Sequence, residues 1–149
     1  MSCPSAGFRW RRWLKGMTDS TASPINPLVV VVDDDAAVRN SLKFSLEIEG
    51  FAVRDFSGGA DLLSAPDLRG CACFVIDQNM PGLSGLDVVA KLRDRRDLLP
   101  VILITSHPTT SLRRRAADAG VCIVEKPLLG TTLFDKIRDV IASPAARSH

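Results

Sequence analysis

Residues 73–89 have the sequence CFVIDQNMPGLSGLDVV, and this stretch decides the fold of the chain. Residues 73–76 are apolar without interruption, which is typical of a strand buried on both faces of a parallel sheet. Proline and glycine residues then mark a loop, and residues 86–94 have the pattern of a helix. A strand that leads through a loop into a helix is the repeating unit of an α/β protein.

The same unit recurs on both sides of this stretch. The predicted strands are residues 28–32, 51–56, 73–76, 101–104 and 121–124, and the predicted helices are residues 36–49, 59–64, 86–94, 109–119 and 131–141. This alternation predicts an α/β fold with a five-stranded parallel sheet, a doubly wound (βα)5 arrangement of the flavodoxin type. Strand 51–56 is more polar than the others, so we expect it at an edge of the sheet.

Length and charge favour one domain that does not bind nucleic acid. The chain has 149 residues, of which 46% are hydrophobic and 24% charged, an ordinary balance for a single globular domain. Its net charge of +2 depends on the basic residues of segment 1–16, without which 15 basic residues face 17 acidic ones. A mildly acidic body lacks the basic face that binding to DNA requires.

The two ends of the chain are predicted to lie outside the domain at 28–142. Segment 1–27 contains FRWRRWLK at 8–15, which suits a flexible leader or, alternatively, an amphipathic helix at a membrane surface. The protein could also start at Met17. Residues 143–149 are expected to be a disordered tail. Because we find no apolar run of about 20 residues and no secretory signal, we expect a cytoplasmic protein.

The cysteines are predicted to be reduced structural thiols. Cys71 and Cys73 are separated by a single residue, which is not the spacing of a zinc or redox pair. Cys73 and Cys122 lie in apolar runs, where cysteine behaves as a small core residue.

Polar residues gather where the apolar strands end. In a parallel sheet these carboxyl ends share one edge, at which ligands bind. The residues at this predicted edge are Asp33, Asp34 and Asp35 after the first strand, Asp77 after the third, Thr105 and Ser106 after the fourth, and Lys126 after the fifth.

These residue types suit phosphoryl transfer. Asp33, Asp34 and Asp77 cannot comfortably all ionise without a cation, and oxygen ligands suit Mg²⁺ or Mn²⁺. A carboxylate such as Asp77 is a competent nucleophile toward phosphorus. Lys126 and a hydroxyl such as Thr105 can bind the phosphoryl oxygens. Taken singly, each residue also has a structural interpretation, and at least one of the three consecutive acids is expected to cap the following helix.

The sequence resembles a known family at this edge. The stretches VVVVDDDAAVRNSL (29–42), CFVIDQNMPGLSGLDVV (73–89), VILITSHP (101–108) and VEKPL (124–128) are similar to the response-regulator receiver, or CheY-like, family, over residues 28–142. The resemblance implies that Asp77 is the phosphoacceptor and that Asp34 binds the metal directly, Asp33 mainly through water, and Asn79 through its backbone carbonyl. It implies that Thr105 is the switch hydroxyl, that Ser106 joins it in binding the phosphoryl group, and that Lys126 is the ion-pair partner of that group.

The resemblance also implies a role in two-component signalling. We expect a stand-alone receiver that takes a phosphoryl group from a histidine kinase or a His-phosphotransfer protein. We do not expect it to be an enzyme, because its own catalysis would be at most a slow self-dephosphorylation. It would act through contacts with a downstream protein, or as a phosphate sink. A homodimer through helix 109–119, strand 121–124 and helix 131–141 is a further possible assembly.

Three positions modify this expectation. Ile123 stands where the family usually has Tyr or Phe, so we expect the signal to reach the outer face of the domain in a reduced or different way. Asn79 and His107 occupy the two positions that resemble the family's tuners of acyl-phosphate lifetime.

Two alternatives belong to other functional classes. An interaction module of the same fold that takes no phosphate is disfavoured by the intact Asp77, Thr105 and Lys126, whereas Ile123 at the usual aromatic position keeps this alternative open. An aspartyl-phosphate phosphatase of the haloacid-dehalogenase type needs an acid where this chain has Asn79. A third alternative, a flavodoxin-like flavin carrier, is also disfavoured, but on weaker grounds. The phosphate-binding loop rich in Ser, Thr and Gly that such carriers have after the first strand is missing.

Overall fold

The structure is a computed structural model that describes residues 26–65, 68, 70–95, 97–128 and 131–142. The expected tail at 143–149, and all of the predicted extension except Asn26 and Pro27, lie outside these residues. The strands are β1 (Leu28–Val32), β2 (Ala52–Phe56), β3 (Cys71–Asp77), β4 (Val101–Thr105) and β5 (Cys122–Glu125). The helices are α2 (Ala36–Ile48), α3 (Gly59–Ser64), α4 (Gly85–Asp94), α5 (Thr110–Asp118) and α6 (Thr132–Ala142).

The five strands form one parallel sheet in the order β2-β1-β3-β4-β5. This order confirms the predicted doubly wound α/β fold, and it places the polar strand β2 at an edge, as expected. The register aligns Val32 with Ile76, and Asp77 with Ile104. The strands β1, β3 and β4 therefore end close to one another at the carboxyl edge of the sheet.

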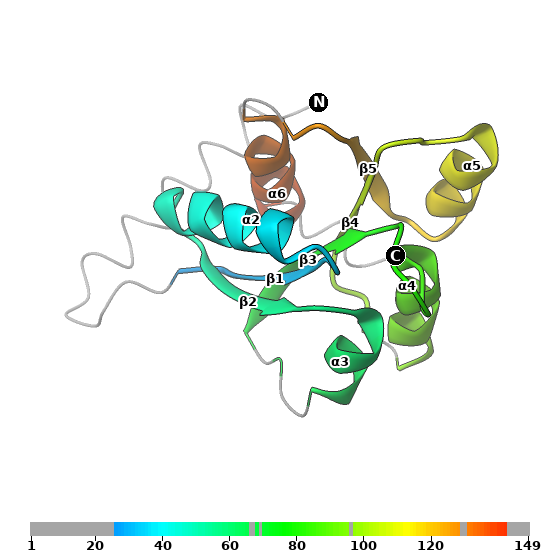
Figure 1. The fold of residues 1–149 in the computed structure, drawn as a ribbon, viewed down its shortest axis with the longest axis horizontal. Helices are drawn as coiled ribbons and strands as arrows, with labels where there is room; N and C mark the ends of the chain where they lie inside the picture. Colours follow the sequence, from blue (N-terminus) through cyan, green and yellow to red (C-terminus); the bar gives the residue numbers. More distant parts are fainter. Residues whose placement is uncertain (1–25, 66–67, 69, 96, 129–130, 143–149) are drawn as a thin grey trace.

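Helices cover both faces of the sheet, as Figure 1 shows. On one face, Leu42 and Leu46 of α2 and Ile137 of α6 pack against alternate residues of the strands. On the other face, α3, α4 and α5 bury their apolar residues against the intervening strand positions. Because both faces are covered, β1 and β4 are apolar at every position but the last residue of β4, which explains the unbroken apolar runs of the sequence.

The predicted boundaries differ from the structure mainly at β3. We predicted a strand at 73–76, but β3 extends over Cys71–Asp77. The reason is that backbone pairing continues at both ends: Asp77 pairs with Ile104 of β4, and Cys71 pairs with Leu28 of β1. An apolar pattern cannot reveal that pairing continues through a polar residue.

Three helices begin at a side chain that accepts hydrogen bonds from their first turn. Asp35 caps α2, accepting from the amides of Ala37 and Val38, as expected for one of the three consecutive acids. Thr109 caps α5, and Ser84 forms a capping box with Asp87 at the start of α4. The caps fix where each helix leaves the carboxyl edge of the sheet.

The cysteines that the structure describes are free thiols. Cys71 and Cys73 are buried and Cys122 is half-buried, in agreement with the expected structural role. Burial raises the pKa of the Cys71 thiol to about 12, so it is a poor nucleophile. Within the described ranges, none of the helices is long and apolar enough to cross a membrane.

Candidate functional site

The carboxyl edge of the sheet brings together residues from four strands. Asp33 follows β1 directly, Asp77 ends β3, Thr105 ends β4, and Lys126 follows β5. These segments are far apart in the sequence, yet the common direction of the strands places their ends together.

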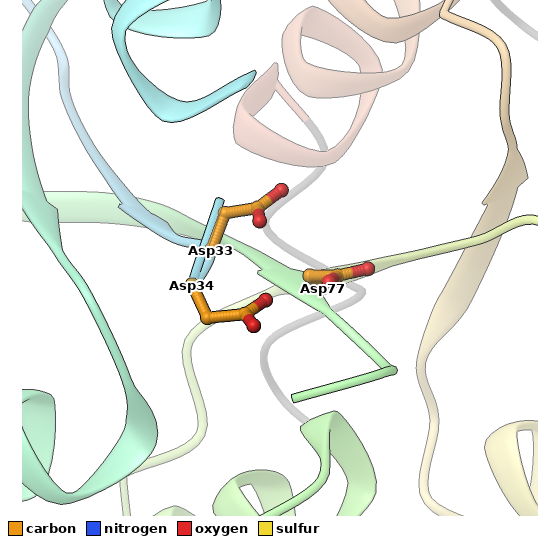
Figure 2. A group of neighbouring side chains, drawn as sticks. All are labelled: Asp33, Asp34 and Asp77. Atoms are coloured by element: carbon orange, nitrogen blue, oxygen red, sulfur yellow. The ribbon is translucent and has the colours of Figure 1, made fainter. Parts of the chain in front are cut away.

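Three carboxylates form the centre of the site. The side chains of Asp33, Asp34 and Asp77 each place an oxygen within 4.8 Å of the oxygens of the other two. Asp33 and Asp77 are only 1% and 4% exposed, whereas Asp34 is exposed. Figure 2 shows Asp33 and Asp34 just after the end of β1, with both side chains on the side where Asp77 lies. The predicted grouping of these acids is therefore present.

Lys126 supplies a positive charge to the two buried acids. Its Nζ lies 3.2 Å from Oδ1 of Asp77 and 3.9 Å from Oδ2 of Asp33. The backbone amide of Lys126 donates to the carbonyl of Thr105 at 2.9 Å, which ties the lysine to the end of β4. The Lys126–Pro127 peptide bond is cis.

Burial makes the two inner acids difficult to ionise. The pKa of Asp77 is raised above its usual range, first by burial and then by the negative charge of Asp33, while Lys126 and the amide of Asn79 act in the opposite direction. The pKa of Asp33 is raised as well, mainly by burial, and a hydrogen bond from Asp35 and the charge of Lys126 offset part of the effect. One lysine therefore does not compensate fully for two buried carboxylates.

The arrangement fits a hard divalent cation. Oδ2 of Asp33 and Oδ1 of Asp77 are buried and have no well-aligned hydrogen-bond partner among the described residues. Buried carboxylate oxygens of this kind need a counter-charge. A cation beside Asp33, Asp34 and Asp77 would satisfy both oxygens, and carboxylate ligands suit magnesium-like ions.

The remaining predicted residues lie at the same edge. Thr105 is buried, and its Oγ1 accepts a hydrogen bond from the amide of His107 at 3.2 Å. Ser106 is exposed and, with Lys126, lines a hollow of about 680 Å³ between α2 and the start of α6. Asn79 is exposed, and its backbone amide donates a hydrogen bond to the carboxylate of Asp77. Its carbonyl as a metal ligand stays a prediction.

Sequence reasoning missed a residue that shapes the loop after Asp77. The side-chain oxygen of Gln78 accepts from the amide of Leu86 at 2.9 Å, and its carbonyl accepts from Gly85 at 3.1 Å. A Cβ on Gly85 would lie 2.5 Å from Leu103 and 2.9 Å from the carbonyl of Asp77. Gln78 and Gly85 thus pack the start of α4 against Asp77. A glycine in the quoted stretch was the available signal, but we interpreted it as a loop residue only.

A second missed feature is an arginine behind the acids. Arg39 of α2 donates from Nη1 to the backbone carbonyl of Asp33 at 2.7 Å and from Nε to Asp55 at 3.0 Å. Its two partners lie directly after β1 and on β2, so no local pattern in the sequence could have revealed that Arg39 contacts both.

Comparison with known proteins agrees with this geometry. The family model described as "Response regulator receiver domain" matches residues 29–138. The transcriptional regulatory protein FixJ of Bradyrhizobium diazoefficiens is 35% identical over 124 residues, which cover 81% of this chain and 60% of FixJ. The C4-dicarboxylate transport transcriptional regulatory protein DctR of Rhodobacter capsulatus is 35% identical over 122 residues, covering 80% of this chain and 62% of DctR.

Solved structures give the same result. The crystal structure of FixJ-N has a TM-score of 0.69 and 33% identity to this chain, and the match covers 84% of this chain and 96% of FixJ-N. The chain spans about 60% of the length of the two curated relatives. The expectation of a stand-alone receiver therefore stays a prediction.

Proposed function

Because the chain belongs to the response-regulator receiver family, we propose that it accepts a phosphoryl group on Asp77 from a histidine kinase or a His-phosphotransfer protein. The observation that carries this proposal is the meeting of Asp77 with Lys126 at 3.2 Å and with the oxygens of Asp33 and Asp34 within 4.8 Å. A buried nucleophile flanked by a lysine and by metal-binding acids is the arrangement that phosphoryl transfer to a carboxylate requires.

The residues of the site have separate tasks in this reaction. One carboxylate oxygen of Asp77 forms a bond to phosphorus as the N–P bond of a phosphohistidine breaks, and the electron pair of that bond stays on the imidazole nitrogen. Lys126, which already lies beside Asp77, binds an oxygen of the arriving phosphoryl group. Thr105 and Ser106 follow each other at the end of β4, where their hydroxyls can donate to the remaining oxygens.

We propose that Asp33, Asp34 and Asp77 hold Mg²⁺, or Mn²⁺, with the carbonyl of Asn79 as a further ligand. The ion would neutralise the negative charge that builds up on the phosphoryl oxygens during transfer. The buried oxygens of Asp33 and Asp77 that lack aligned partners support this assignment. The raised pKa of Asp77 supports it as well, because a nearby cation would favour the ionised form of the nucleophile.

We further propose that signalling proceeds through protein contacts, and that the chain has at most a slow self-dephosphorylation activity. Its immediate partner is then a sensor kinase or a His-phosphotransfer protein. Sustained turnover of a small phosphomonoester would contradict this view, because it would make the chain a phosphatase.

The test uses acetyl phosphate as a small phosphodonor in the presence of Mg²⁺. Intact-mass spectrometry should show one added phosphoryl group on the unmodified chain, no addition to Asp77→Asn, and no addition when the metal is chelated. Asp34→Asn should need far more Mg²⁺ for the same yield. Asp35→Ser is the matched control, because it removes an adjacent acid yet keeps a good cap on α2, and it should behave as the unmodified chain does.

Two results would overturn the proposal. One is an equal phosphoryl yield in Asp77→Asn, which would place the acceptor elsewhere. The other is no phosphoryl uptake by the well-folded unmodified chain from acetyl phosphate and from a panel of phosphorylated kinases. That result would favour a phosphorylation-independent interaction module.

A further inference from the structure

Three of the four polar groups of Asp33 form hydrogen bonds. Its amide donates to the carbonyl of Phe56 at 3.2 Å, and its Oδ1 accepts from the amide of Asp35 at 2.9 Å. Its backbone carbonyl accepts from Arg39 Nη1 at 2.7 Å, the shortest of the three bonds. The fourth group, Oδ2, has no hydrogen-bond partner among the described residues and lies 3.9 Å from the Nζ of Lys126.

Arg39 is itself fixed from the opposite side. Its Nε lies 3.0 Å from Oδ2 of Asp55 on β2, and its side chain is only 17% exposed. Lys43, one turn further along α2, lies 3.9 Å from the other oxygen of Asp55 and is 41% exposed. The guanidinium therefore spans the gap between β2 and the residue that follows β1, with one nitrogen on each.

We propose that Arg39 is a positioning residue for the metal site, a role that rests on the proposed function. The carbonyl of Asp33 and the amide of Asp34 belong to one rigid peptide plane. A hydrogen bond that fixes this plane sets the direction in which both acids leave the backbone. Among the described residues, Arg39 forms no hydrogen bond or ion pair with the carboxylates of Asp33, Asp34 or Asp77, so it would act on the cation through the backbone. Groups that orient metal ligands in this way affect affinity strongly when they are removed.

The experiment compares Mg²⁺ affinity in Arg39→Gln and in the matched control Lys43→Gln. Both variants remove one positive charge from α2 and one partner of Asp55, but only Arg39 contacts Asp33. Affinity is measured from amide chemical shifts during titration with MgCl₂, so it does not depend on phosphorylation. Arg39→Gln should bind Mg²⁺ about tenfold or more weakly than the unmodified chain. Lys43→Gln should bind with nearly unchanged affinity.

A second measurement, on metal-free protein, complements the Mg²⁺ affinity. Loss of the hydrogen bond to the Asp33 carbonyl changes the polarisation of the Asp33–Asp34 peptide. The amide ¹⁵N resonance of Asp34 should therefore shift in metal-free Arg39→Gln and stay in place in Lys43→Gln. This measurement separates positioning of the acids from a general loss of charge.

Unchanged Mg²⁺ affinity in a folded Arg39→Gln, or equal losses in both variants, would overturn the role of Arg39 and leave the proposed function intact. Failure of the unmodified chain to bind Mg²⁺ would overturn both. If Arg39→Gln does not fold, Arg39→Lys takes its place. It should show a smaller loss in the same direction, because lysine cannot span both partners, and unchanged affinity there would also overturn the inference.

Discussion

Replacing Lys126 with methionine tests the electrostatics of the site without any metal or phosphate. Lys126 has its Nζ within 4 Å of a carboxylate oxygen of both buried acids, Asp33 and Asp77. Methionine keeps much of the length of the side chain and removes the charge. The metal-free variant must therefore bury two neighbouring carboxylates without the ammonium group.

The size of the effect follows from the two distances. At an effective dielectric constant of about 20, unit charges attract by about 5 kcal/mol at 3.2 Å and about 4 kcal/mol at 3.9 Å. The Lys126 side chain is 25% exposed, so water screens part of this attraction. The lysine also recovers its hydration and its freedom of rotation on unfolding. We expect the free energy of unfolding to fall by about 2–4 kcal/mol at neutral pH.

The deficit should depend on pH with a defined sign. Burial, and after it the charge of neighbouring acids, already raises the pKa values of Asp33 and Asp77 in the folded protein. Lys126 lowers both pKa values, so its loss should raise them further. A carboxyl group whose pKa is raised on folding costs stability at high pH, and this cost disappears as the pH falls through the folded-state pKa. The difference between the variant and the unmodified chain should therefore shrink as the pH falls through the raised folded-state pKa values of the two carboxyl groups.

Urea unfolding of chelator-treated protein gives the required free energies. The matched control is Lys43→Met, because Lys43 forms an exposed ion pair with Asp55 at 3.9 Å, and its loss should cost less than about 1 kcal/mol. The double variant Lys126→Met with Asp77→Asn should recover most of the deficit, since only one buried carboxylate remains. A loss no larger than that of Lys43→Met, or a deficit that stays constant with pH, would refute the reasoning.

Three further predictions concern the surroundings of Asp77. Gly85→Ala should lower the free energy of unfolding by about 1–3 kcal/mol, because the new Cβ would lie 2.9 Å from the carbonyl of Asp77, and urea unfolding that shows no loss would contradict this contact. Ile123 is half-buried, and we expect it to weaken or redistribute the response of α5, β5 and α6 to a beryllofluoride phosphoryl mimic, measured as changes in amide chemical shifts. Ile123→Tyr should enlarge these changes. A full-sized response in the unmodified chain would contradict this prediction. Asn79→Arg and His107→Ala should change the rate of acyl-phosphate hydrolysis, followed by phosphate release, more than the yield of phosphorylation, and unchanged decay in both variants would count against a tuning role.

The fold and the central residues of the site were predictable for one physical reason. Apolar runs identify the strands that are buried on both faces, and parallel strands end at one edge. The positions of Asp33, Asp77, Thr105 and Lys126 follow directly from this rule, since each stands at the end of a predicted strand. The structure confirms their common location, while their chemical roles remain predictions.

The supporting contacts were not predictable, because they depend on which strands are neighbours. Arg39 meets Asp55 through the pairing of β1 with β2, and the two residues are sixteen positions apart. Gln78 reaches Leu86 because the loop after Asp77 folds back on the start of α4. Hydrophobic periodicity reports which face of an element is buried, but it does not report where a polar side chain finds its partner.

The order in which the strands contribute to the site has a consequence for synthesis of the protein. Lys126 follows the last strand, and its backbone amide donates to the carbonyl of Thr105 at the end of β4, so the acids gain the partial compensation of this charge only when β5 joins the sheet. A nascent chain that has left the ribosome only as far as β4 carries Asp77 without this lysine. If the proposed function holds, such an incomplete chain should accept a phosphoryl group poorly, because Lys126 is not yet in place beside Asp77.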